Sequence, residues 1–100
     1  MIVKRKEALE QAINIVCSDR DQMYGTPEDN FSTIAGYWTH YLGTNIGPED
    51  VAVMMILMKI ARISASEYKS VDSWVDIAGY AACGCEITTD RDEEVQSEGA

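Results

Sequence analysis

A chain of 100 residues is long enough for one folded domain with one hydrophobic core and too short for two. Hydrophobic residues make up 46% and charged residues 25% of the sequence, which is typical of a globular protein and excludes a fibrous or fully disordered chain. The net charge of -9 excludes non-specific binding to nucleic acid or to anionic lipid, because both require a basic surface.

The hydropathy of the chain and its first residues predict where the protein resides. No run of about 18 apolar residues is present, so the sequence predicts no membrane-spanning helix. The opening segment MIVKRKEALE lacks the apolar stretch of a signal peptide. We therefore expect a cytoplasmic protein that makes no contact with membranes.

Four segments have apolar residues at intervals of three and four, the spacing of one face of an amphipathic helix. These segments are about residues 3–17, 27–42, 48–63 and 71–86. Pro27 and Pro48 suit the first helical position, and Gly43 suits the residue that follows a helix end. No segment alternates apolar and polar residues as a strand does, so we predict an all-α fold, a four-helix bundle.

The apolar faces of these helices are expected to form the core. They carry Leu9, Ala12, Ile13 and Val16 in the first helix, Phe31, Ile34, Ala35, Trp38 and Leu42 in the second, and Trp74, Ile77, Ala78, Ala81 and Cys85 in the fourth. The third helix differs, because residues 51–61 (VAVMMILMKIA) are apolar around the whole circumference. Such a helix is buried on every side, so we expect a core shared in a homo-oligomer; the alternative is a central helix in a monomer.

The acidic charge is unevenly distributed along the chain. Residues 87–100 (ITTDRDEEVQSEGA) hold five acids, one base and few apolar side chains. This composition is typical of a solvated, frayed terminus. We therefore divide the chain into one helical domain, residues 1–86, and an acidic flexible tail, residues 87–100.

Four charged residues interrupt the apolar pattern of the last two helices. Lys59 and Arg62 lie on one side of the third helix, and Asp72 and Asp76 lie on one side of the fourth. The connection between these helices is short, so we expect them to run antiparallel, with residues equally far from the turn level with each other. This places Lys59 level with Asp76 and Arg62 level with Asp72.

Two interpretations fit this arrangement of charges. In the first, the four residues form semi-buried salt bridges that specify the register of the helices. In the second, they line a polar pocket in which the carboxylates bind Mg²⁺ and the cations hold phosphate oxygens.

Another group of polar residues lies around the connection between the first two helices. It includes Arg20, Tyr24 and Asn30. One interpretation is ordinary turn and cap chemistry. The other is a loop over the polar pocket, in which these residues contact a substrate, with Arg20 on phosphate and Tyr24 stacked on a base.

Several short segments resemble a family of small phage and prophage proteins. They are Asp19-Arg20 with Tyr24-Gly25-Thr26-Pro27 and Asn30-Phe31, then Pro48-Glu49-Asp50-Val51-Ala52, then Lys59-Ile60-Ala61-Arg62, and Asp72-Ser73-Trp74-Val75-Asp76-Ile77-Ala78-Gly79-Tyr80. The resemblance covers about residues 7–87. It implies a phage- or prophage-encoded protein and carries little settled biochemistry.

That family in turn is similar to the all-α nucleoside triphosphate pyrophosphatases, the MazG and dimeric dUTPase group. The resemblance implies a helical, oligomeric, Mg²⁺-dependent protein that cleaves nucleoside triphosphates to monophosphate and pyrophosphate. The signature of the group is a Glu-Glu-x-x-Glu run on one helix and a Glu-x-x-Asp on a later one. Asp72 and Asp76 correspond to the later element, at a spacing of four instead of three. The first run is absent, and Glu49 and Asp50 are the only paired acids that open the preceding helix.

The resemblance assigns roles to individual residues. Asp72 and Asp76 are the implied catalytic carboxylates and, together with Glu49 or Asp50, the implied Mg²⁺ ligands. The implied substrate-binding residues are Lys59, Arg62, Arg20, Tyr24 and Asn30.

Two hypotheses on function follow. The first is a nucleotide pyrophosphohydrolase-like protein, a Mg²⁺-dependent hydrolase acting on a (deoxy)nucleoside triphosphate or a related nucleotide. The alternative is a non-catalytic phage protein that sequesters a nucleotide signal or binds a host protein. Without the Glu-Glu-x-x-Glu run the sequence does not decide between them, because two or more metals normally neutralise a polyphosphate for attack by water.

Overall fold

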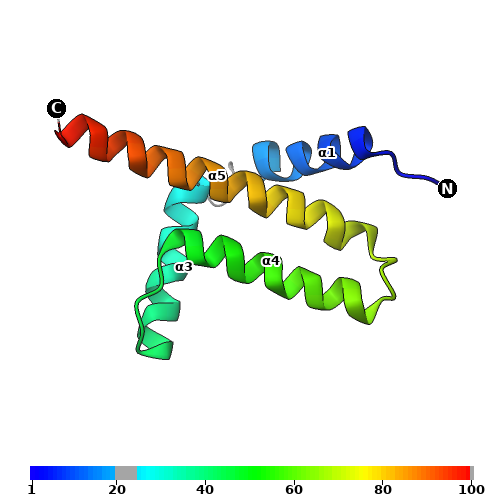
Figure 1. The fold of residues 1–100 in the computed structure, drawn as a ribbon, viewed down its shortest axis with the longest axis horizontal. Helices are drawn as coiled ribbons and strands as arrows, with labels where there is room; N and C mark the ends of the chain where they lie inside the picture. The colour runs from blue at the N-terminus through cyan, green and yellow to red at the C-terminus, as the bar shows by residue number, and fades with distance from the viewer. Residues whose placement is uncertain (20–24, 100) are drawn as a thin grey trace.

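A computed structural model describes the backbone of residues 1–19 and 25–99 and the side chains of residues 1–17 and 25–90. All regular structure in these ranges is helical, which confirms the all-α prediction. Figure 1 shows the elements, which are α1 (Arg5–Asn14), the π-helical turn η1 (Ile15–Asp19), α3 (Pro27–Leu42), α4 (Pro48–Ala65) and α5 (Val71–Gly99).

The sequence signals for helix boundaries are confirmed at α3 and α4, which both begin at a proline. The Thr26 side chain caps α3 by accepting the backbone N–H of Asp29 at 3.3 Å. Asp50 caps α4, because its Oδ2 accepts the backbone N–H of Gly47 at 2.9 Å. Gly43 ends α3 with a left-handed φ of 68°, a conformation that costs a glycine little.

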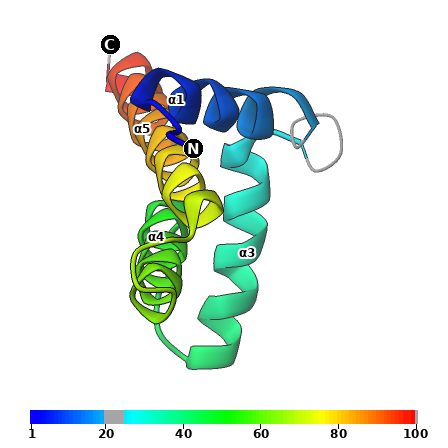
Figure 2. The same cartoon turned by 90° about the vertical axis from the view of Figure 1, so that its right-hand side faces the viewer.

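Helices α4 and α5 form an antiparallel hairpin, which is the most extensive contact between elements. In Figure 1, α3 runs across this hairpin rather than along it, and α1 runs beside α5. In Figure 2, α3 lies on one side of the hairpin and α1 crosses the edge that α5 forms. No described helix lies beside α4 on the side away from α3.

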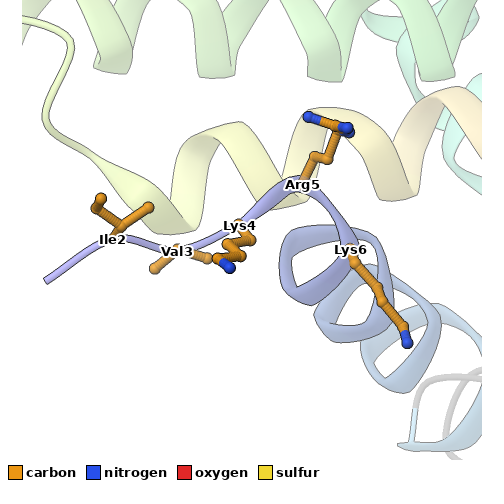
Figure 3. A pocket seen from close by; sticks show the side chains of 5 residues that line it. All are labelled: Ile2, Val3, Lys4, Arg5 and Lys6. Carbon is orange, nitrogen blue, oxygen red and sulfur yellow. The ribbon is translucent and has the colours of Figure 1, made fainter.

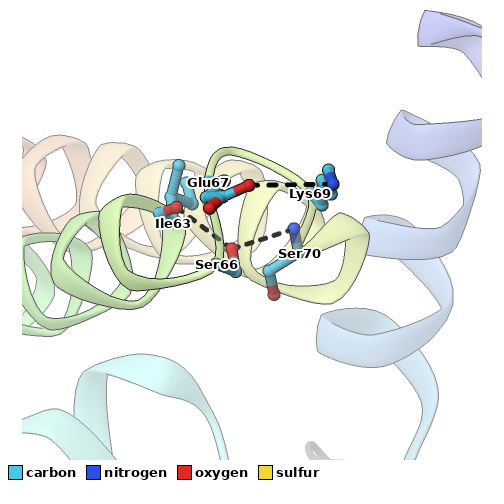
Figure 4. Close-up of polar contacts among 5 residues, drawn as sticks. All are labelled: Ile63, Ser66, Glu67, Lys69 and Ser70. Atoms are coloured by element: carbon cyan, nitrogen blue, oxygen red, sulfur yellow. Dashed lines mark hydrogen bonds and ion pairs between the residues drawn. The ribbon is translucent and has the colours of Figure 1, made fainter.

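The turn between α4 and α5 is closed by hydrogen bonds (Figure 4). The Ser66 hydroxyl donates to the Ile63 carbonyl at 3.0 Å and accepts the backbone N–H of Ser70 at 3.2 Å. Glu67 and Tyr68 both have positive φ values, 56° and 68°, which side chains other than glycine and asparagine rarely adopt. The two left-handed residues reverse the chain within a few positions and so bring α5 back along α4.

The core lies where α3 crosses the hairpin. Its buried residues are Phe31, Ala35, Val51, Ala52, Tyr80, Cys83 and Ile87. The rings of Phe31 and Tyr80 pack with their centroids 6.3 Å apart, which joins α3 to α5. Gly79 allows close approach of the first helical segment, because a Cβ at this position would lie 3.0 Å from Val16 Cγ1.

Helix α5 is turned differently from the sequence prediction. The predicted core face includes Trp74, which is 52% exposed, and Ala81 and Cys85, which are also exposed. The buried positions of α5 are instead Ser73, Val75, Gly79, Tyr80, Cys83 and Ile87. The sequence predicted both an inward apolar face and an inward Asp76, although the two lie on opposite sides of the helix. In the structure Asp76 faces α4, and the apolar face therefore turns outward.

A single chain does not bury residues 51–61 on every side, which does not fit the alternative of a central helix in a monomer; the core shared in a homo-oligomer stays a prediction. Val53, Leu57 and Ile60 of α4 are 54%, 58% and 49% exposed. Helix α1 shows the same pattern, with Leu9 and Ile13 more than half exposed while Ala12 is buried. The side chains of α4 are exposed because α3 and α5 together cover only part of the circumference of this helix.

Most of the segment that composition assigns to the tail, residues 87–100, is helical in the structure. Helix α5 continues without a break to Gly99, and Ile87, placed in the tail by composition, is only 2% exposed. A single isoleucine at helical spacing from Cys83 is enough to anchor this turn to the core. The radius of gyration, 15.1 Å, exceeds the about 13 Å typical of a 100-residue domain, so the chain is more extended than an ordinary closed bundle.

Candidate functional site

A buried ion pair joins the two helices of the hairpin. Lys59 Nζ lies 2.9 Å from Asp76 Oδ2, and the two side chains are 11% and 21% exposed. A lone ammonium or carboxylate is costly to bury, so each charge compensates the other between the helices. The level pairing that the sequence predicts for these two residues is confirmed.

The second predicted pair is arranged differently. Arg62 and Asp72 are both exposed, and no ion pair joins these two described side chains. Arg62 follows Lys59 by about one turn and Asp72 precedes Asp76 by about one turn. The four residues therefore form a strip that runs from a buried pair to the solvent-exposed end of the hairpin, and we call it the polar strip.

The structure does not bring Glu49 and Asp50 to the polar strip. Lys59 is level with Asp76, and Glu49 precedes Lys59 by about 15 Å along the axis of α4, at about 1.5 Å per residue. Asp50 caps the first turn of α4 through Gly47. Glu49 and Asp50 therefore lie away from Asp72 and Asp76 within one chain, because the two helices run antiparallel and their N-terminal ends lie at opposite ends of the hairpin. The role of Glu49 or Asp50 as a Mg²⁺ ligand stays a prediction.

The polar strip offers two carboxylates to a metal ion. Among the described side chains, no group of three or more His, Cys, Asp or Glu residues gathers as a metal site does. Mg²⁺ is commonly held by one or two carboxylates while substrate phosphates and water complete its coordination. Asp72 and Asp76, on one side of α5, therefore fit a single Mg²⁺ shared with a phosphate ligand and do not fit a cluster of several ions.

The predicted loop over the pocket is only partly described. Arg20 and Tyr24 lie outside the described residues. Asn30 is half-buried in the first turn of α3, where its backbone N–H donates to the Thr26 carbonyl at 2.9 Å. The role of its side chain in substrate binding stays a prediction.

The sequence analysis missed a buried hydroxyl between the two acids of α5. Ser73 is 4% exposed, and its Oγ lies 2.8 Å from Ser70 Oγ. Ser70 directly precedes α5, and its carbonyl accepts the backbone N–H groups of Ser73 and Trp74. A serine before a helix start with a second polar residue three positions later is a capping pattern, and that signal could have identified the pair.

A basic segment lies at the N-terminus, outside the polar strip. Lys4, Arg5 and Lys6 are exposed and, with Ile2 and Val3, line a shallow hollow of about 580 Å³. Figure 3 shows the Arg5 and Lys6 side chains pointing in opposite directions. The three cations therefore do not converge on one ligand position.

The fold and the polar strip define an all-helical protein with a paired lysine and aspartate inside a helical hairpin. A family model described as a domain of unknown function, DUF6378, matches residues 7–88. The chain belongs to this family. The match includes every residue of the polar strip and most of α5.

Two phage proteins are similar to the chain. The "Gene 55 protein" of Mycobacterium phage D29 is 45% identical over 75 residues, which are 75% of this chain and 49% of the relative. The "Gene 55 protein" of Mycobacterium phage L5 is 49% identical over 74 residues, 73% of this chain and 47% of the relative. The chain thus spans about half the length of these relatives.

The relatives support a phage protein of unknown function, and the phage resemblance read from the sequence is confirmed to that extent. No solved structure matches the chain. Within the described residues, no helix is long and apolar enough to cross a membrane.

Proposed function

We propose that this protein binds a (deoxy)nucleoside triphosphate, or a related nucleotide, on the polar strip and hydrolyses it to a monophosphate and pyrophosphate. The observation that carries the proposal is the Lys59–Asp76 pair, whose atoms lie 2.9 Å apart at the inner end of the strip. A single ion pair of this kind would be enough to specify the register of the two helices. Two further charges, Arg62 and Asp72, extend the strip to solvent, where a ligand reaches them.

The strip contains the groups that a triphosphate requires. Lys59 and Arg62 are cations that bind phosphate oxygens, and the arginine fork can hold two oxygens at once. Asp76 positions the Lys59 ammonium at the inner end of the strip. Asp72 and Asp76 are the residues that would hold Mg²⁺, which supplies neutralisation of phosphate charge when bound.

The resemblance to the all-α nucleoside triphosphate pyrophosphatases supports the same class of reaction. In that group the acids lie on two helices, and here the later element of the signature corresponds to Asp72 and Asp76. Likeness of fold does not by itself assign an activity, so the proposal depends on the polar strip.

A second candidate function is nucleotide binding without turnover. It is favoured by the small number of acids, because the described side chains bring together two carboxylates rather than the larger set of the pyrophosphatase signature. Such a protein would sequester a nucleotide signal through the same cations.

Thermal denaturation with a panel of nucleotides, with and without Mg²⁺, tests the proposal. A ligand at about one hundred times its dissociation constant stabilises the fold by about 2.7 kcal/mol, which is visible as a melting shift. We expect a Mg²⁺-dependent shift with at least one triphosphate, together with release of monophosphate and pyrophosphate. A shift without products supports the sequestering protein, and no shift with any nucleotide contradicts both candidates.

Charge-neutral variants locate the site. Asp72→Asn is expected to abolish product release while leaving the melting temperature of the free protein within a few degrees, because Asp72 is exposed. Glu67→Gln is the matched control, since Glu67 is an exposed acid at the nearby turn whose only ion pair among the described residues, with Lys69 at 3.8 Å, is exposed too. Equal loss of activity in both variants would contradict a site on the polar strip.

A further inference from the structure

The α4/α5 hairpin buries an ion pair beside its apolar core and exposes further large apolar side chains on its outside. Lys59 is 8% exposed and pairs with Asp76, whereas Leu57 and Trp74 are 58% and 52% exposed. Soluble helices normally have polar and charged residues on their exposed sides. An exposed apolar surface of this extent marks a binding surface.

On α4 the exposed apolar residues share one side of the helix. Val53, Leu57 and Ile60 are spaced by four and three residues, and all are about half exposed. From Val51 to Ala65 the only charged residues are Lys59, which is buried, and Arg62, which lies on another side of the helix. The side of α4 that carries Leu57 is therefore free of charge.

On α5 the outward side is built from smaller residues. Ala78, Ala81 and Cys85 follow Trp74 at helical spacing; Ala81 and Cys85 are exposed and Ala78 is partly exposed. From Ser73 to Cys85 the only charged residue is Asp76, which faces α4. This side is therefore free of charge as well.

Both uncharged sides lie on the same face of the hairpin. At about 100° per residue, the buried positions of α4 and α5 point away from Leu57 and Ala78, respectively. Figure 2 shows α3 on one side of the hairpin, α1 across the edge that α5 forms, and no helix beside α4 on the side away from α3. We call the uncovered surface the outer face and define it by Val53, Leu57, Ile60, Trp74, Ala78, Ala81 and Cys85.

We propose that the outer face binds the outer face of a second copy of this chain, with the twofold axis parallel to the helices. This symmetry places α4 of one subunit over α5 of the other, in antiparallel orientation. The alternative axis, perpendicular to the helices, would place the large side chains of α4 against each other and the small ones of α5 against each other.

The register of the hairpin determines which residues meet. Lys59 is level with Asp76, and Gly84 lies beside Ala52, with 3.4 Å between the Ala52 Cβ and a Cβ built on Gly84. With the axis parallel to the helices, the same levels hold between subunits. Leu57 then lies over Ala78 of the partner subunit, and Val53 lies over Ala81 of the partner subunit.

The sizes of these side chains fit a self-complementary contact. Along the middle of the hairpin, Val53 and Leu57 of α4 meet alanines of α5, which is how packed helices interdigitate. Near the turn, Ile60 lies over Trp74 of the partner subunit, which is an apolar contact between two large side chains. A second copy is the occupant that supplies both halves of this pattern at once. Because the chain has a net charge of -9, two copies approach each other most easily through a face that carries no charge.

The outer face is also large enough for a stable dimer. Helix α4 has 18 residues and so measures about 27 Å, and two helices side by side are about 20 Å wide. The footprint is therefore about 500 Å² on each subunit. The two footprints together measure about 1,000 Å², which reaches the lower size limit of specific protein interfaces. The accessible surface that is buried exceeds this flat footprint, because side chains protrude from it.

Sedimentation of the full chain measures the mass in solution. We expect twice the mass of one 11.1 kDa chain at micromolar concentration, and a melting temperature that rises with protein concentration. Leu57→Asp is expected to give the mass of one chain and to remove the concentration dependence. The matched control is Leu9→Asp on α1, because Leu9 is 57% exposed and lies outside the outer face, and this variant is expected to stay dimeric.

A size exchange tests the register. Ala78→Phe is expected to weaken dimerisation at least tenfold, because the added ring occupies the space of Leu57 of the partner subunit. Adding Leu57→Ala in the same chain is expected to restore dimerisation to within about threefold of the wild type.

The wild type sedimenting as a single chain at every concentration would overturn the proposal. A dimer that survives Leu57→Asp but is lost in Leu9→Asp would also overturn it, since the interface would then lie on α1. Failure of Leu57→Ala to rescue Ala78→Phe, with helicity retained by circular dichroism, would contradict the placement of α4 over α5. The polar strip lies on the other side of the hairpin, so these variants leave nucleotide-induced melting shifts in place, and the two proposals fail separately.

Discussion

The two sides of the α4/α5 hairpin differ in charge and in burial. The inner side holds Lys59 and Asp76 with their charged atoms 2.9 Å apart, and Tyr80, which packs against Phe31, follows Asp76 by about one helical turn. The outer side exposes Leu57 and the other apolar residues of the outer face and carries no charge.

The difference teaches that an ion pair and the apolar residues on its side of a helix, here Val75 and Tyr80, can face inward together while a second apolar stripe stays exposed. Asp76 and the Trp74 stripe lie on opposite sides of α5, so only one of them can face α4. Exposing the stripe costs hydrophobic energy in the single chain, but that cost is recovered if another surface covers it. A Lys59 ammonium buried between the helices without Asp76 would have no partner to offset its desolvation cost.

Truncation of a core side chain is expected to give the largest difference in the free energy of unfolding between a buried and an exposed position. Ile87→Ala should lower the free energy of unfolding by about 3 kcal/mol, because the side chain is 2% exposed and its removal leaves a cavity. Ile13→Ala, at a position 56% exposed on α1, should cost less than about 1 kcal/mol. Urea denaturation measures both, and equal losses would mean that residue 87 belongs to a mobile tail after all.

Removal of one charge from the inner side is the next largest effect. Lys59→Met should lower the free energy of unfolding by about 2–3 kcal/mol, since it leaves Asp76 buried without a partner. The expected loss is below that of a fully buried charge because the Asp76 side chain is 21% exposed. Denaturant titration at neutral pH measures it, and a change below about 0.5 kcal/mol would show that water already solvates the carboxylate.

Removal of both charges together should reverse most of that loss. Lys59→Met combined with Asp76→Leu should leave stability within about 1 kcal/mol of the wild type, because apolar residues of similar size replace a buried ion pair at little cost. Comparison with the two single variants in a double-mutant cycle gives the coupling energy. A double variant as unstable as Lys59→Met alone would mean that the space between the helices requires charge.

The smallest effect is expected at the far end of α4. Asp50→Ala should cost about 1 kcal/mol, because it removes the acceptor of the Gly47 N–H at 2.9 Å. It should leave any Mg²⁺-dependent melting shift unchanged, since Asp50 lies far from Asp72 along the hairpin. Loss of the Mg²⁺ response in this variant would indicate that a second subunit brings its acids to the polar strip.

Much of the fold could be predicted from the sequence because its signals are local. A proline at the first turn, a capping side chain and a glycine after the last turn determine α3, and the structure has the same boundaries. The sequence placed Lys59 level with Asp76 because the connection between α4 and α5 is short, which makes the two helices antiparallel neighbours. The rotation of α5 could not be predicted. It depends on whether the side with Asp76 or the side with Trp74 packs against the other helices, and residue spacing alone does not decide between them.

The site was less accessible to prediction than the fold. Charge spacing along two helices was enough to place the polar strip, but it could not show that Arg62 and Asp72 remain apart at the exposed end. The separation of Glu49 from Asp72 depends on the lengths of two helices, and composition carried no signal that Ile87 continues the core. The Ser70–Ser73 contact could have been predicted, because a serine before a helix start with a polar residue three positions later is a capping pattern.

The central claim is that the polar strip binds a nucleotide and does not merely hold two helices together. Titration calorimetry of the wild type and of the Lys59→Met, Asp76→Leu double variant, with a triphosphate that stabilises the wild type and with Mg²⁺, tests it most directly. The account predicts that the wild type binds and that the double variant, folded and of similar stability, loses at least about tenfold in affinity, or about 1.4 kcal/mol. Equal binding by both proteins, or no binding by the wild type, would contradict the claim and leave the ion pair with a structural role alone.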